Sequence, residues 1–306
     1  MFGLLVIGWD TLIVIIYGII ATAVGVVLVK SGLHSSQNHF KNMSLNTVTT
    51  ERVIFEFEDG LKTVGKFYRS ISQTISTSEG RRYPDPRPAV VFFHGFRSKK
   101  ESSERLLIPL ASYGYIGFSF DQRGHGEAGS SKGDRFQIFN DARAVIDRVC
   151  AANDVRGGGL CCIGISLGGT SVLTKCYEDK RVAMVVGMST FHSIDAFGKV
   201  RFHPFSVGKF FRWIMTKTTK KDKKTEPRDY LKSDPEYNKN RVFLIHGRKD
   251  VLFPPEMTFE LNKQQAGIPE EHALLLENAG HGLDDQELLV LATLIKWMSE
   301  NEATAL

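Results

Sequence analysis

The sequence has few cysteines, and no two of them are spaced as CxxC. Four cysteines in 306 residues are too few for the disulfide framework of a small secreted scaffold, and their spacing does not suit a zinc site. We therefore expect reduced thiols. The formal net charge of +5 is modest for this length, so a nucleic-acid partner is not indicated. With 42% hydrophobic residues, the chain is not a wholly disordered protein.

The first long hydrophobic run contains no charged residue. Residues 11–29 read TLIVIIYGIIATAVGVVLV. A helix that rises about 1.5 Å per residue would nearly span a hydrocarbon core of about 30 Å over this length. Asp10 precedes the run, whereas Lys30 and Lys41 follow it. By the positive-inside tendency, we expect a single-pass transmembrane anchor over residues 1–30, with the following domain in the cytoplasm.

Two other readings of this end of the chain stay open. The run could be a cleaved secretory signal with its cleavage site at Ala21-Thr22-Ala23. However, no Lys or Arg precedes it, and it continues to residue 29. The tripeptide Asn42-Met43-Ser44 is a glycosylation sequon that would favour a lumenal domain. The polar residues 31–50 are predicted to form a linker.

Residues 51–306 are predicted to form one α/β domain. Alternating apolar residues at 52–57 and 63–68 flank an Asp59-Gly60 turn signal, which predicts an opening hairpin. Beyond it, short apolar runs alternate with helical segments, which indicates a mostly parallel central sheet with helices on both faces. The predicted core strands are 89–93, 115–120, 160–163, 182–188, 242–245 and 273–276, and the predicted helices are 104–113, 136–152, 167–177, 256–266 and 286–298.

Residues 191–240 break this alternation. They contain no clear strand, and an insertion of this length between core strands is more often a functional lid than a structural need. The insertion is rich in aromatic residues and lysines, among them Phe202, Phe205, Phe210, Phe211, Trp213, Lys217, Lys220, Lys221, Lys223 and Lys224. Such a mixture suits a membrane surface. Packing of the aromatic residues on the core, with the lysines in solvent, accounts for it equally well.

The pattern Gly164-Ile165-Ser166-Leu167-Gly168 fits the G-x-S-x-G nucleophile elbow. A predicted strand precedes it and a predicted helix follows it, which is the setting that this motif requires. Glycines permit the sharp turn that exposes the Ser166 hydroxyl. A serine hydroxyl is a weak nucleophile and needs a base that is itself oriented by an acid. The alternative is a glycine-rich turn whose serine only caps the next helix.

The predicted base is His281 and the predicted acid is Asp250. Each follows a predicted strand, at the edge where open parallel sheets bind their ligands, and the order Ser, Asp, His matches the motif. Asp195 is an alternative acid. Three other histidines lie in glycine-flanked turns and are expected to hydrogen-bond loop backbone: His94, His125 and His246.

An oxyanion hole should accompany these side chains. We expect one donor to be the backbone N–H of Leu167, directly after the nucleophile. The other should be the backbone N–H of Phe96, in the turn His94-Gly95-Phe96 that follows the first core strand.

These motifs together resemble the α/β-hydrolase superfamily, from about Val53 to the C-terminus. His94-Gly95-Phe96 and Asp121-Gln122-Arg123-Gly124-His125-Gly126 look most like the branch that includes monoglyceride lipases and the serine aminopeptidase S33 group. Members of that branch mostly cleave carboxylic esters, some thioesters and a few peptides. A serine at the elbow, rather than an aspartate, disfavours the dehalogenase and epoxide hydrolase branches. The transmembrane run and the unassigned lid depart from typical members.

The resemblance implies a serine hydrolase that cleaves a carboxylic ester or thioester through an acyl-enzyme. The hydrophobic run adds a membrane anchor, and the anchor and the aromatic-rich lid together point to a substrate of lipid or acyl type. The substrate would be a small molecule or a lipid. No metal or organic cofactor is required for this chemistry. Two alternatives stay open: a serine peptidase or aminopeptidase of the same fold, and a non-catalytic binding module built on it.

Overall fold

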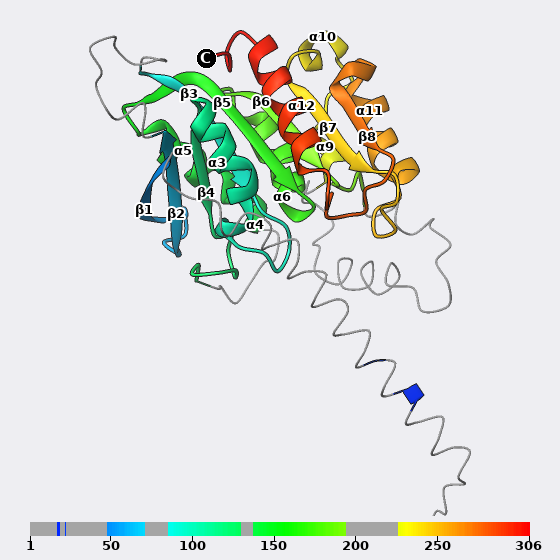
Figure 1. Ribbon diagram of the computed structural model, residues 1–306, viewed down its shortest axis with the longest axis horizontal. Helices are drawn as coiled ribbons and strands as arrows, with labels where there is room; N and C mark the ends of the chain where they lie inside the picture. The colour runs from blue at the N-terminus through cyan, green and yellow to red at the C-terminus, as the bar shows by residue number, and fades with distance from the viewer. Residues whose placement is uncertain (1–16, 19–21, 23–47, 71–84, 130–136, 194–225) are drawn as a thin grey trace, which may run out of the picture. The chain divides into compact units, whose positions relative to one another are not determined.

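The computed structural model (Figure 1) describes residues 17–18, 22, 48–70, 85–129, 137–193 and 226–306. The chain forms two compact units, Met1–Met43 and Ser44–Leu306. The predicted anchor over residues 1–30 lies outside the described residues except at Tyr17, Gly18 and Thr22. Within the described part, no helix has the length and apolar character needed to cross a bilayer.

The second unit contains one sheet, with eight strands in the described residues, in the order β1-β2-β4-β3-β5-β6-β7-β8. β1 and β2 form the predicted opening hairpin. The pairs β1–β2 and β2–β4 are antiparallel, and the other five pairs are parallel. The prediction of a mostly parallel sheet is therefore confirmed. The strands are β1 Val48–Glu56, β2 Lys62–Ser70, β3 Arg87–Phe93, β4 Ile116–Phe120, β5 Val155–Ile165, β6 Val182–Met188, β7 Val242–Gly247 and β8 Ala273–Leu276.

Helices cover both faces of the sheet, as the sequence predicts. α5, η3 and α11 contribute buried residues to the hydrophobic cluster on one face, and α3 and α12 to the cluster on the other. The helices are η2 Lys100–Ser103, α3 Glu104–Tyr113, α4 Gln137–Asn140, α5 Ala142–Cys150, α6 Leu167–Ser171, η3 Val172–Cys176, α9 Pro227–Tyr230, α10 Pro235–Asn238, η4 Pro255–Met257, α11 Phe259–Ala266, η5 Glu270–His272 and α12 Glu287–Glu300.

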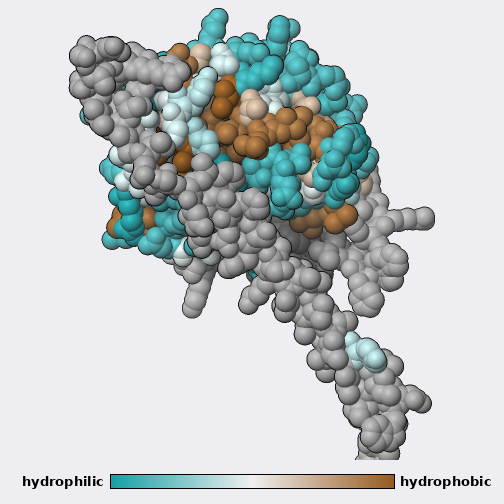
Figure 2. Space-filling model, viewed as in Figure 1, coloured by the Kyte–Doolittle hydropathy of each residue, from teal (hydrophilic) through white to brown (hydrophobic). Residues whose placement is uncertain are grey.

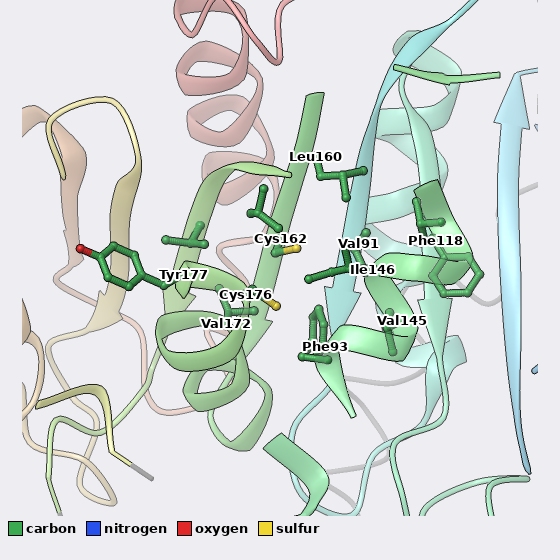
Figure 3. Close-up of a cluster of buried hydrophobic side chains, with 14 of the residues drawn as sticks. Val91, Phe93, Phe118, Val145, Ile146, Leu160, Cys162, Val172, Cys176 and Tyr177 are labelled. Carbon is green, nitrogen blue, oxygen red and sulfur yellow. The ribbon is translucent and has the colours of Figure 1, made fainter. Parts of the chain in front are cut away.

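The central strand β5 belongs to both clusters because successive side chains of a strand point to opposite faces. Cys162 packs in the cluster beside α5 and η3, where Figure 3 shows it near Cys176, whereas Cys161 packs in the opposite cluster. All four cysteines are free thiols. Cys161 and Cys162 thus pack in the core on opposite faces of the sheet.

Two predicted helices differ from the structure. Residues 136–152 were expected to form one helix, but α4 ends before Asp141 and α5 begins after it. The Asp141 carboxylate accepts two hydrogen bonds from Arg123 in the loop after β4, which ties this break to that loop. The helix expected over 167–177 widens to a π-helix in η3, where the Thr174 hydroxyl donates to the Thr170 carbonyl. Of the predicted lid, residues 194–225 lie outside the described residues.

Candidate active site

Ser166 occupies a strained turn between β5 and α6. Its backbone has φ 55° and ψ −114°, a conformation that residues with a Cβ rarely adopt. Hydrogen bonds hold it there. The Ser166 N–H donates to the Met188 carbonyl of β6 at 2.9 Å, and the Ser166 carbonyl accepts from the Thr190 hydroxyl at 2.9 Å. The elbow predicted from the sequence is therefore present as a local structure.

The glycines of the elbow are required by close backbone approach. A Cβ at Gly164 would overlap the carbonyl of Gly168, and a Cβ at Gly168 would overlap the carbonyl of Phe93 at the end of β3. These two contacts bring β5, α6 and β3 together beside Ser166, at the carboxyl ends of the strands. The expectation that side chains there would collide is confirmed.

The structure brings Ser166, His281 and Asp250 into one chain of hydrogen bonds. His281 Nε2 lies 3.0 Å from Ser166 Oγ, and His281 Nδ1 lies 2.8 Å from Asp250 Oδ2. An ionised carboxylate only accepts hydrogen bonds, so Nδ1 carries the proton, and Nε2 of the neutral ring accepts from the Ser166 hydroxyl. This arrangement allows the imidazole to take the serine proton.

Asp250 is fully buried as a side chain and yet ionised. Its Oδ1 accepts the backbone N–H groups of Leu252 and Phe253 at 2.9 and 2.8 Å. Burial raises the pKa of Asp250, but hydrogen bonds from His246, His281 and the Phe253 N–H outweigh burial and lower this pKa to about 2. The carboxylate therefore stays charged across the neutral range and can stabilise an imidazolium beside it.

Asp250 and His281 meet because the loops after β7 and β8 pack closely. A Cβ at Gly247, the last residue of β7, would overlap the carbonyls of Ala279 and Gly280. The next residues extend the contact, since the Lys249 N–H donates to the Ala279 carbonyl at 2.9 Å. Glycine at position 247 thus sets the distance between the acid and the base.

The predicted oxyanion donors lie on two segments that adjoin Ser166. A Cβ at Gly95 would lie 3.6 Å from the Cβ of Ser166. The Ser98 N–H donates to the Gly95 carbonyl at 3.2 Å, so Phe96 is the second residue of a turn whose hydrogen bond does not use its N–H. Leu167 is the first residue of α6, where backbone N–H groups have no partner within the helix.

A buried ion pair fixes the turn that carries Phe96. Lys100 Nζ lies 2.8 Å from Asp121 Oδ2, and the Lys100 N–H donates to Asp121 Oδ1 at 2.8 Å. Asp121 is wholly buried and also accepts the Glu127 N–H at 2.9 Å. Sequence reasoning missed this pair. Its signal was an aspartate directly after a buried strand, a position where a charge requires a partner.

The remaining histidines behave as the sequence predicts. His94 Nδ1 donates to the Gly95 carbonyl at 2.8 Å, and its Nε2 accepts the Gln122 N–H at 3.0 Å. Burial lowers the pKa of His94 to about 4, so this ring is neutral. His125 and His246 also contact backbone carbonyls. The alternative acid, Asp195, lies outside the described residues. Among the residues described, no cluster of three or more metal-binding side chains occurs.

A mostly parallel sheet with helices on both faces, carrying a strained serine that meets an imidazole at the carboxyl ends of its strands, is the arrangement of the α/β-hydrolase superfamily. The chain belongs to the serine aminopeptidase S33 family, whose model matches residues 84–240, just over half of its length. The matched region contains Ser166, whereas Asp250 and His281 follow it.

Two curated relatives match parts of the chain. A monoglyceride lipase of Saccharomyces cerevisiae is 32% identical over 105 residues, which cover 33% of this chain and 34% of the relative. A 2,6-dihydropseudooxynicotine hydrolase of Paenarthrobacter nicotinovorans is 28% identical over 112 residues, 37% of this chain and 30% of the relative. The chain thus spans about a third of the length of these relatives.

Solved structures share the fold over most of the chain. An esterase of Pyrococcus furiosus superposes with a TM-score of 0.62 at 18% identity, covering 85% of this chain and 94% of its own. An acetyl xylan esterase from Paenibacillus sp. R4 superposes with a TM-score of 0.61 at 16% identity, covering 84% and 86%. At these identities the likeness establishes the fold.

Proposed function

We propose that this protein is a membrane-anchored serine hydrolase that cleaves carboxylic esters or thioesters of lipid or acyl type. The observation that carries the proposal is the chain of hydrogen bonds from Ser166 through His281 to Asp250, at 3.0 and 2.8 Å. The name of the yeast relative, a monoglyceride lipase, supports the choice of an acyl substrate.

In the proposed reaction, Ser166 Oγ attacks the substrate carbonyl carbon while its proton passes to His281 Nε2. The oxygen of the tetrahedral intermediate becomes negative and accepts hydrogen bonds from the Phe96 and Leu167 N–H groups. The intermediate collapses to the acyl-enzyme, and the alcohol or thiol leaves with the proton from His281. Water then attacks the acyl carbon and gives a proton to the same nitrogen. His281 passes that proton to Ser166 Oγ as the bond between Oγ and the acyl carbon breaks, which releases the acid and free serine. Asp250 keeps Nδ1–H oriented throughout.

Labelling with an alkyl fluorophosphonate tests the assignment. Such a probe phosphonylates an activated serine, so labelling should disappear in Ser166→Ala and weaken strongly in His281→Ala. Asp250→Asn should lose around 10⁴-fold in turnover, because the imidazole then adopts the wrong tautomer. Ser102→Ala, in η2, is the matched control and should label as wild type. Undiminished labelling of Ser166→Ala would refute the proposal.

A chain-length series of esters and thioesters defines the substrate class. We expect turnover of these acyl substrates to exceed that of aminoacyl anilides. The reverse order would favour the aminopeptidase reading that the family description raises. Absence of turnover on every substrate by a folded, unlabelled protein would favour a binding module.

The anchor and its orientation are also proposed. The support is the uncharged run at residues 11–29, followed by lysines. The full chain should stay in the membrane pellet after carbonate extraction, and Ile15→Arg/Ile19→Arg should release it. Asn42 should carry no glycan in a eukaryotic host if the domain is cytoplasmic. A glycan at Asn42 would reverse the orientation.

A further inference from the structure

A second imidazole lies beside Asp250 and approaches the same carboxylate oxygen, Oδ2, that His281 contacts. His246 is the fifth residue of β7, and its ring is buried, with 1% of the residue exposed. Its Nε2 lies 2.7 Å from the Phe253 carbonyl oxygen and 3.3 Å from Asp250 Oδ2. A carbonyl and an ionised carboxylate both only accept hydrogen bonds, so this nitrogen carries a proton and donates to them.

Phe253 connects His246 to both partners of the proposed acid and base pair. Its backbone N–H donates to Asp250 Oδ1 at 2.8 Å. Its ring lies edge-on to the imidazole of His281, with centroids 4.8 Å apart and an interplanar angle of 89°. The N–H of His246 therefore restrains Phe253. The backbone of Phe253 orients the Asp250 carboxylate, and its ring packs against the imidazole of His281.

We propose that His246 is a positioning residue for hydrolysis, acting through Asp250 and Phe253 to hold the His281 imidazole in line with Ser166. The proposal rests on the proposed function. It assigns a role to a histidine that does not itself touch Ser166. His246 acts by donating a hydrogen bond in a fixed direction to the buried Asp250 carboxylate. The low local dielectric strengthens this bond.

Two substitutions separate the hydrogen bond from the packing. In His246→Gln the amide Nε2 reaches about as far as the imidazole Nε2 and can donate in its place. In His246→Met the side chain has a similar length but no donor. We expect kcat of the Met variant to fall about 10- to 100-fold, the loss that follows from removing a hydrogen bond to a charged group. KM should change little, and the Gln variant should recover most of kcat.

A double-mutant cycle tests the route through Asp250. In the Asp250→Asn background the carboxylate is absent, so the hydrogen bond from His246 has already lost its charged acceptor. Adding His246→Met to this background should therefore reduce kcat by less than about threefold. The matched control is His272→Met. His272 lies in η5 before β8, with its ring tilted by 38° against that of Phe243, and the substitution there should leave kcat unchanged.

The outcomes distinguish this inference from the proposed function. If Ser166→Ala still turns over ester, the proposed function fails. If Ser166→Ala is inactive but the Met and Gln variants have equal kcat, or if the cycle is additive, His246 has only a structural role and this inference fails. If His246→Met does not fold, His246→Asn replaces it. Its amide is too short to reach the Phe253 carbonyl, so kcat should again fall, and wild-type kcat in this variant would overturn the inference.

Discussion

Replacing Ser166 by glycine is expected to leave the folded protein more stable than replacing it by alanine. Both substitutions remove the hydroxyl and its hydrogen bond to His281, so they differ only in the Cβ. That atom matters because the residue has φ 55° and ψ −114°, where glycine is unstrained. The comparison therefore measures the backbone strain stored at the nucleophile.

The magnitude follows from two opposing terms. A residue with a Cβ in such a region costs about 1 to 3 kcal/mol. Glycine loses about 0.4 to 1 kcal/mol relative to alanine through the greater freedom of its unfolded chain. The difference favours the glycine variant by about 1 kcal/mol in the free energy of unfolding. For a unit of this size, that corresponds to about 2 °C in melting temperature.

Chemical denaturation of the full chain in detergent, followed by circular dichroism, measures the two variants side by side. Ser299 provides the matched control, since it is exposed near the end of α12 and helical. There the order should reverse, with Ser299→Gly about 1 kcal/mol less stable than Ser299→Ala. A glycine at position 166 that is less stable than alanine would show that the turn stores no strain.

Three further substitutions give testable results. Asp121→Asn should lower the free energy of unfolding by about 2 kcal/mol, because it replaces the buried carboxylate beside Lys100 by an amide while Glu101 and Glu127 still contact the ammonium. Additivity of this loss with that of Lys100→Met would contradict the pairing. Gly168→Ala should slow fluorophosphonate labelling by about 100-fold, because its Cβ displaces the end of β3 from the elbow; wild-type labelling would contradict the contact. The pKa of Asp250, lowered from its ordinary value of 3.8 to about 2 by hydrogen bonds that outweigh burial, stabilises the fold above pH 3.8. The unfolding free energies of wild type and Asp250→Asn should therefore converge by about 2 kcal/mol as the pH falls through 2. A difference that stays constant would contradict it.

The sheet could be predicted from the sequence because its strands are short and buried on both faces. β6 and β8 have the predicted bounds, and β3, β4 and β7 differ by one or two residues at an end. β5 is longer than predicted at both ends, and its first residues, 155–159, include three consecutive glycines that give no strand signal. Apolar runs identify a strand's buried centre, and its ends are set by backbone pairing.

The sequence predicts those residues of the candidate site that belong to a motif. It does not predict those whose place is set by tertiary contacts. Ser166, Asp250 and His281 each follow a strand, so a sheet edge brings them together. Lys100 does not follow a strand. His246 directly follows a predicted strand, but the sequence does not indicate its partners, which become apparent only once the loops are folded. A buried charge pair and a buried imidazole depend on neighbours distant in the sequence.

Phe96 contributes its main chain to the proposed oxyanion hole, while its side chain is 62% exposed and meets the ring of His125 edge-on. The side chain of Phe96 can therefore change without changing its backbone N–H donor. Natural variation or directed evolution can exchange the ring for a smaller or more polar group and keep the amide donor in place.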